Sequence, residues 1–102
     1  MHGDYLAAIY LVSANDETWK RMADAISGRY IDFTRVKLAE ITSYGYLLIK
    51  TAQDIYTGTF HLDFQTLCDP YVVSNKSFEM IITAMRIARE GLEYTGIEKK
   101  YN

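Results

Sequence analysis

The strongest helical signal of the chain lies in residues 44–58, which read YGYLLIKTAQDIYTG. Apolar and small side chains recur there at i, i+3, i+4, i+7 and i+8: Tyr44, Leu47, Leu48, Thr51, Ala52, Ile55 and Tyr56. Such spacing places them on one face of an α-helix. Thr42 or Ser43 can cap the start of this helix, and Gly58 suits the left-handed residue that ends one. The segment predicts an amphipathic helix, with the tyrosines of this row at the edge of the core.

A second amphipathic stripe follows further along the chain. It consists of Phe78, Ile81, Ile82, Met85 and Ala88. Residues 74–77, Ser-Asn-Lys-Ser, are rich in capping side chains, and Gly91 can end the helix. We expect the stripes around Leu48 and Ile82 to face each other in a single core.

The first part of the chain predicts two more helices. Residues 4–12 have helical spacing behind an Asp4 cap. The second helix begins with acidic residues and carries one apolar row: Trp19, Met22, Ala23 and Ile26. Gly28 stands where a left-handed residue would end this helix.

Two segments have mixed patterns. Residues 32–40 follow neither the helical nor the strand period throughout, and we assign them to a helix. Residues 60–67 are open between a strand and a short helix. We favour a helix over residues 63–68, before Pro70, because no second strong strand is present to pair with an isolated one.

The composition is typical of one folded domain. Of 102 residues, 49% are hydrophobic and 24% are charged, and the six glycines and one proline are scattered without forming a linker. We predict a single all-α domain over residues 1–102, a compact bundle of four to six short helices. Residues 91–102 are expected to form a frayed tail.

Charge and cysteine content narrow the class of protein. The formal net charge of -2 disfavours nucleic acid as a partner. The single cysteine, Cys68, allows no intramolecular disulfide and fits a reducing cytoplasm. The first residues lack the basic region of a signal peptide, and no window approaches the roughly 20 apolar residues of a membrane span. We expect a cytoplasmic protein with no membrane partner.

Patterns for catalysis or cofactor binding are weak. The two histidines, His2 and His61, do not have the spacing of metal ligands, and no glycine-rich phosphate loop is present. We therefore predict neither a metal nor a cofactor. Cys68, Asp69 and His61 are residue types that could act as nucleophile, orienting group and base. We favour the alternative that Cys68 is a small buried residue at the end of a turn.

A helix-turn-helix is the other pattern that the sequence suggests. The row that begins at Trp19, a turn at Gly28 and a helix from Asp32 superficially match it. Only Arg35 and Lys37 of that second helix could contact phosphate. DNA binding therefore ranks low among the interpretations.

The unusual feature of the composition is nine tyrosines. Tyrosine combines apolar area with a polar tip, which suits a core edge and the centre of a protein interface alike. Tyr10 and Tyr46 project from their helices opposite the apolar rows, so we name them as candidates for partner contacts. Arg86 and Arg89, one helical turn apart, are candidates for binding a phosphate or nucleotide.

Two stretches resemble a small helical family of unknown function from Gram-positive bacteria and their phages. Residues 10–18, YLVSANDET, followed by Lys20-Arg21, are similar to the family's YLLS-x-N-x-x-T, and residues 52–58, AQDIYTG, are similar to its AFNLYNGY. Residues 77–87 also resemble its last helix. The chain departs from the family at residues 42–44, where the family has a tryptophan-containing turn. The resemblance implies no activity. It implies a mobile-element setting, in which small acidic proteins bind and block a host factor.

Our first hypothesis is a small non-enzymatic module that binds a protein partner, as a phage or mobile-element inhibitor of a host factor. A homodimer is compatible with its exposed aromatic residues. The alternative is a small-ligand or nucleotide-binding protein, in which tyrosine stacks on a base while Arg86 and Arg89 hold phosphate. An enzyme that uses Cys68 ranks below both.

Overall fold

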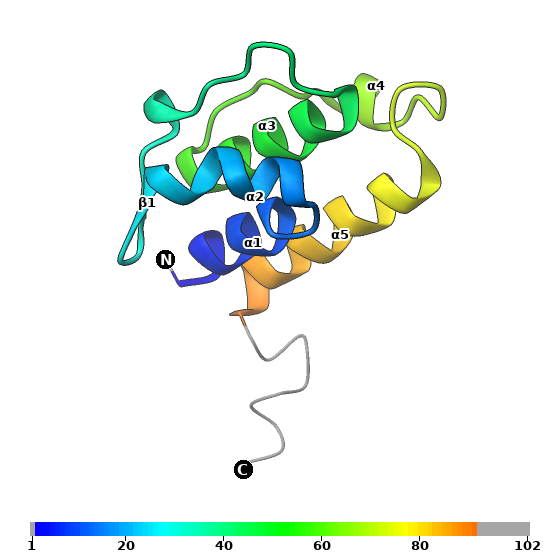
Figure 1. Cartoon of the computed structure of the whole chain (residues 1–102). Coiled ribbons are helices and arrows are strands. Elements are labelled where there is room, and N and C mark those ends of the chain that lie inside the picture. Colours follow the sequence, from blue (N-terminus) through cyan, green and yellow to red (C-terminus); the bar gives the residue numbers. More distant parts are fainter. Residues whose placement is uncertain (1, 92–102) are drawn as a thin grey trace.

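The structure is a computed structural model that describes residues 2–91. Five α-helices, two 3₁₀ turns and one two-stranded hairpin make up this part of the chain (Figure 1). In chain order they are α1 (His2–Val12), α2 (Asp16–Met22), η1 (Ala23–Ala25), β1 (Ile26–Ser27), β2 (Tyr30–Ile31), η2 (Phe33–Arg35), α3 (Ser43–Thr57), α4 (Phe64–Leu67) and α5 (Asn75–Glu90). The predicted fold class, a small domain built from four to six helices, is confirmed.

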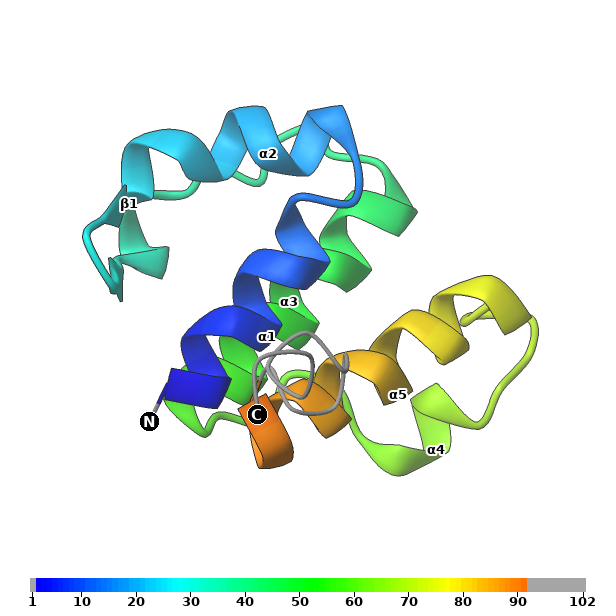
Figure 2. The same cartoon turned by 90° about the horizontal axis from the view of Figure 1, so that it is seen from below.

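Helix α1 lies between α3 and α5 and contacts both of them (Figure 2). Its fully buried residues are Ala7, Ala8, Leu11 and Val12. Four more apolar side chains of α1 are half-buried, which makes this helix apolar around most of its circumference. A helix with that pattern belongs in the interior. Asp4, expected as its cap, lies inside the first turn because α1 begins at His2.

Small residues allow α1 and α5 to approach closely. A Cβ atom on Gly3 would clash with the carbonyl oxygen of Ala88. Ala7, one turn after Gly3 on α1, and Ala84, one turn before Ala88 on α5, are completely buried. Since larger side chains at these positions would separate the two backbones, this close approach determines which face of α5 is buried.

The predicted orientation of the α5 stripe is therefore wrong in part. The residues that α5 buries are Ser77, Ile81, Ala84 and Ile87. Phe78 and Met85, which we placed in the core, are exposed, and Ile82 is half-buried. Ile81 of the predicted row is buried, whereas Phe78 and Met85 lie at the edge of the interface because Ala84 and Ala88 on the neighbouring face approach α1.

Helix α3 follows its sequence pattern closely. Leu47, Leu48, Thr51 and Ala52 are buried, and both tyrosines of the row lie at the edge of the core as predicted. Of the two candidate caps, the structure selects Thr42, whose side chain accepts a hydrogen bond from the Gly45 N–H at 3.0 Å. Gly58 ends the helix in the left-handed conformation, with φ of 73°.

The segment between α2 and α3 contradicts two predictions. Helix α2 ends at Met22, and the chain continues through η1 into the β1–β2 hairpin, with Gly28 in its turn. The helix expected over residues 32–40 is reduced to the single turn η2. Asp32 starts that turn by accepting from the Thr34 N–H, and beyond it half-buried Val36 and Leu38 alternate with exposed neighbours. This alternation is typical of extended chain, so the second helix of a helix-turn-helix is not formed here.

Two other predictions concern the C-terminal end of α5 and the possibility of a membrane-spanning helix. Gly91 closes α5 with φ of 66°, and the rest of the predicted tail lies outside the described residues. Among residues 2–91, no helix combines the length and the apolar character that crossing a bilayer requires.

Candidate functional site

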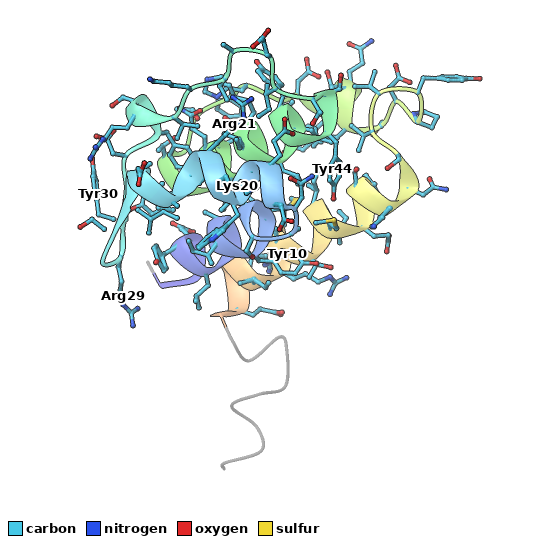
Figure 3. All side chains as sticks on the ribbon, viewed as in Figure 1. Tyr10, Lys20, Arg21, Arg29, Tyr30 and Tyr44 are labelled. Carbon is cyan, nitrogen blue, oxygen red and sulfur yellow. The ribbon has the colours of Figure 1, made fainter. Side chains whose placement is uncertain are left out.

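The four residues predicted to bind a partner lie in different surroundings. Tyr10 is half-buried and packs against the main core, beside α5 in Figure 3. Tyr46 is 43% exposed and borders a hollow with Ile41 of the preceding loop. Arg86 and Arg89 are exposed and border a separate hollow on α5. The structure thus brings the two arginines together, and it does not gather all four residues into one hollow.

The candidate thiol site is not assembled. Cys68 is exposed at the end of α4, contrary to the expectation that it is buried. The imidazole Nδ1 of His61 lies 2.7 Å from a carboxylate oxygen of Asp54 and 3.3 Å from the Thr59 hydroxyl. His61 is therefore positioned by α3 and the loop that follows it, and its contacts with Asp54 and Thr59 hold the loop against the helix.

The feature that sequence reasoning missed is the connection between α3 and α5, residues 58–74. It runs back along α3, forms the short helix α4 and then turns into α5 (Figures 1 and 2). Leu62, Leu67 and Val73 anchor it from beneath by packing on Leu47 of α3 and Ile81 of α5. This second, smaller core fixes the position of the connection on the bundle.

The same connection presents a second set of apolar side chains to solvent. We call this set the connection patch: Phe60 (95% exposed), Phe64 (79%), Tyr71 (98%) and Val72 (58%). A loop that has buried one set of apolar residues normally turns polar side chains outward. Here four large apolar side chains of an anchored segment are exposed instead, a feature typical of interaction sites when such side chains form one patch.

A carboxylate from α3 fixes the first part of the connection. Asp54 accepts hydrogen bonds from the backbone N–H of His61 (2.8 Å) and of Leu62 (2.9 Å). It also accepts from the Thr59 hydroxyl at 2.7 Å and from the His61 side chain. Partial burial raises the pKa of Asp54, but the hydrogen bonds from His61, Thr59 and Leu62 outweigh burial and hold that pKa below its ordinary value.

Two further aspartates shape the remainder of the connection. Asp63 caps α4 by accepting from the Thr66 N–H at 2.8 Å, and hydrogen bonds from Thr66 hold the pKa of Asp63 below its usual value. The side chain of Asp69 accepts from the Tyr71 N–H at 2.9 Å, while its carbonyl accepts from the N–H groups of Val72 and Val73. Each turn that presents a residue of the connection patch is thus held by its own hydrogen bonds.

Three adjoining hollows lie along the connection. The first, about 170 Å³, is bordered by Asp54 and Ile55 of α3, Phe60 of the connection and Met85 of α5. The second, about 380 Å³, is bordered by Tyr46 and Val72, and it shares Leu62 with the first.

The third hollow, about 310 Å³, lies beside Cys68 and Phe78 and shares Leu67 with the first. Apolar side chains therefore border a shallow, continuous strip that extends from Ile55, near the C-terminal end of α3, to the N-terminal end of that helix and around α4. Such a strip can receive side chains from another molecule without any rearrangement of the bundle.

The sequence contains a weak signal for this site. In residues 60–67, apolar side chains recur both at the two-residue spacing of a strand and at the spacing of a helix, so the sequence left the conformation of this segment open. The structure shows that one set is buried and the other exposed. The contact between Asp54 and His61 crosses the end of a helix, and no sequence periodicity indicates it.

Comparison with known proteins found no matching family model, curated protein or solved structure. The resemblance to a phage-associated helical family therefore stays a prediction. In the part of the chain that the structure describes, no group of three or more His, Cys, Asp or Glu side chains is placed to hold a metal ion.

Proposed function

We propose that this protein is a small binding module that docks a protein partner on the connection patch. The observation that carries the proposal is the exposure of Phe60, Phe64, Tyr71 and Val72 on a segment whose other apolar side chains anchor it to α3 and α5. Burying one such side chain in an interface is worth about 1.5–3 kcal/mol. A few aromatic anchors of this kind supply most of the affinity of many protein complexes.

Nucleotide binding, the alternative, has less support. Arg86 and Arg89 share their hollow with Glu90, whose carboxylate would repel a phosphate. Tyr10 and Tyr46, the tyrosines predicted to contact a partner, do not border that hollow. A cysteine-dependent reaction also has less support, since the hydrogen bonds of the His61 side chain within residues 2–91 go to Asp54 and Thr59 and not to Cys68.

The setting of the protein is part of the proposal. The single cysteine favours a reducing cytoplasm, where an exposed thiol stays reduced. The family resemblance of residues 10–18 and 52–58 favours a phage or mobile element as the origin and a host protein as the partner that is blocked.

Site-specific photocrosslinking tests the proposal. A benzophenone analogue of phenylalanine replaces Phe64 or Tyr71 in one pair of variants, and Trp19 or Tyr30 in a control pair. All four positions are exposed, and Trp19 and Tyr30 belong to α2 and the hairpin (Tyr30 is labelled in Figure 3). After irradiation in cells that naturally produce the protein, we expect one discrete protein adduct at positions 64 and 71 only.

A purified partner then provides the binding measurement. The variant Phe60→Ser/Phe64→Ser/Tyr71→Ser should bind that partner at least roughly 30-fold more weakly than wild type, which corresponds to about 2 kcal/mol for hot-spot residues. The control variant Trp19→Ser/Tyr30→Ser should bind as wild type does. Adducts at all four positions alike, or at none, would contradict the proposal.

A further inference from the structure

The charged side chains of residues 51–75 have one sign when His61 is counted as neutral. Between Lys50 and Lys76 the sequence contains no lysine or arginine, and it contains three aspartates: Asp54, Asp63 and Asp69. Their combined charge exceeds the net charge of -2 of the whole chain. The rest of the molecule is therefore close to neutral or slightly positive, and the acidic character is concentrated on this connection and the part of α3 beneath it.

The charge at the rim of the hollows is also negative. Among the residues that border the three hollows along the connection, the only charged side chain is that of Asp54. Three basic side chains lie on other elements: Lys20 and Arg21 project from α2, and Arg29 projects from the hairpin (Figure 3). Lys50 lies nearer, because its Nζ is 5.7 Å from the ring centroid of Tyr46, which borders the second hollow. Hydrogen bonds hold the pKa values of Asp54 and Asp63 below their ordinary values, so both carboxylates are ionised at neutral pH.

The length of the strip limits the shape of an occupant. On α3, the strip extends from Ser43 to Ile55, and these twelve residue steps cover about 18 Å at the rise of an α-helix. That distance equals about three turns of a helix lying alongside. A peptide that binds as an added β-strand would need a free sheet edge to pair with, and the strands of residues 2–91 are confined to the two-residue pair β1–β2 outside this strip.

We infer that the partner of the connection patch presents a short amphipathic helix whose apolar face meets Phe60, Phe64 and Val72 and whose flanking lysines or arginines face Asp54, Asp63 and Asp69. This inference rests on the proposed function and names the chemistry of the partner. Helices in hydrophobic grooves dock through apolar residues at i, i+3, i+4 and i+7, and charges at the rim select the partner and its orientation.

Matched peptides test the inference. The first is a fluorescently labelled amphipathic helix of about 18 residues, long enough to be partly helical alone, with leucine on one face and lysine on the other. The second has glutamate in place of every lysine, and the third has glutamine. Fluorescence anisotropy in a low-salt buffer measures the affinity of the full chain for each peptide.

The wild-type chain should bind the lysine peptide roughly ten-fold or more tightly than the glutamate peptide, because each exposed charge pair contributes up to about five-fold. The glutamine peptide should fall between them. Raising the salt concentration to about 0.5 M should reduce the difference, since exposed charges are then screened.

Two variants separate local charge from net charge. In Asp63→Asn/Asp69→Asn, the amide oxygens can still accept the hydrogen bonds from the Thr66 and Tyr71 N–H groups, so the turns keep their caps while two charges are lost. The control Asp16→Asn/Asp24→Asn removes the same charge from exposed positions on α2 and η1. We expect the preference for lysine to fall to about three-fold or less in the first variant and to be unchanged in the control.

The outcomes distinguish this inference from the proposed function. Equal affinity for the lysine and glutamate peptides, or an equal loss in both double variants, overturns the inference even where photocrosslinking at positions 64 and 71 succeeds. Crosslinking that fails at those positions overturns the proposed function itself. Stronger binding to phosphatidylcholine vesicles than to any peptide, or self-association that Asp63→Asn/Asp69→Asn leaves unchanged, would assign the patch to a lipid surface or to a second copy and overturn the inference.

Discussion

The carboxylate of Asp54 in α3 accepts a hydrogen bond from the imidazole of His61 at 2.7 Å, across the end of the helix that Gly58 terminates. The same carboxylate accepts from the backbone N–H groups of His61 and Leu62. One side chain thereby binds both the backbone and a side chain of the segment that carries the connection patch. This arrangement explains how a loop with highly exposed aromatic residues keeps a defined conformation.

Replacing Asp54 should make stability less dependent on pH. Asp54→Asn loses the charge and one acceptor oxygen, which should lower the free energy of unfolding at pH 7 by about 1–3 kcal/mol. The pKa of Asp54 is lower in the folded protein than its ordinary value of 3.8, so its contribution is complete above that value and is lost as the pH falls through the folded pKa. Urea unfolding between pH 7 and about pH 2.5 measures the difference between wild type and variant.

The control for this comparison is Asp24→Asn, an exposed aspartate of η1. Its free energy of unfolding should follow that of wild type in parallel. A difference between wild type and Asp54→Asn that stayed constant down to about pH 2.5 would show that the charged carboxylate of Asp54 does not stabilise the fold.

The crossing of α1 and α5 predicts that an ordinarily favourable substitution will be harmful. Gly3→Ala should favour the α-helix by up to about 1 kcal/mol from propensity alone. In this protein the added Cβ would clash with the carbonyl oxygen of Ala88, so the helices must separate. We expect a net loss of about 1–3 kcal/mol, as for other overpacked cores, in denaturant unfolding at neutral pH. An increase in stability would mean that the two helices are not in close contact at Gly3.

Of the two neighbouring hydroxyl residues at the start of α3, Thr42 caps the helix and Ser43 does not. Thr42→Ala should cost about 1 kcal/mol, because the Thr42 side chain caps α3 through the Gly45 N–H. Its hydroxyl also donates to Glu17 at 2.5 Å, and that hydrogen bond holds the pKa of Glu17 below its usual value. Ser43→Ala, at the next exposed position, should change the melting temperature little. Equal losses in the two variants would contradict the cap assignment.

The connection patch should be important for binding and dispensable for folding. In Phe60→Ser/Phe64→Ser/Tyr71→Ser, each replaced side chain is at least 79% exposed, so its removal leaves no cavity. Surface substitutions of this kind usually change stability by less than about 0.5 kcal/mol each. Leu67→Ser, by contrast, removes an anchor of the second core and should destabilise the protein. Thermal unfolding of both variants compares their melting temperatures with that of wild type. A similar decrease in both variants would show that the patch is part of the core.

The parts of the fold that the sequence predicted correctly depend on local interactions. Helix α3 forms through hydrogen bonds between residues four apart, its cap Thr42 acts within three residues, and Gly58 ends it with a backbone conformation that glycine adopts without strain. Each of these signals is contained in a short window. The periodicity around Leu48 and the capping residues therefore predicted the helix and its limits, and they predicted its buried face in part, because Ile49 outside the predicted row is also buried.

The errors arose where a distant segment determines the outcome. The row of Phe78 and Met85 on α5 is as apolar as that of α3, yet it is exposed because Gly3 and Ala7 of α1 allow only the small-residue face of α5 to approach. Residues 32–40 contain helix-forming side chains, but Asp32 begins a tight turn and the following apolar side chains pack on the core in extended chain.

The sequence by itself determined the class of fold, the ends of α3 and α5 and the acidic charge of residues 51–75. Only the tertiary structure decided which apolar side chains are left over once the cores are filled. Leu62 and Phe64 are both apolar and two positions apart, and nothing local says that the first is anchored between α3 and α5 while the second faces solvent. Burial depends on the area that neighbouring elements cover, and that area is set by how the helices pack.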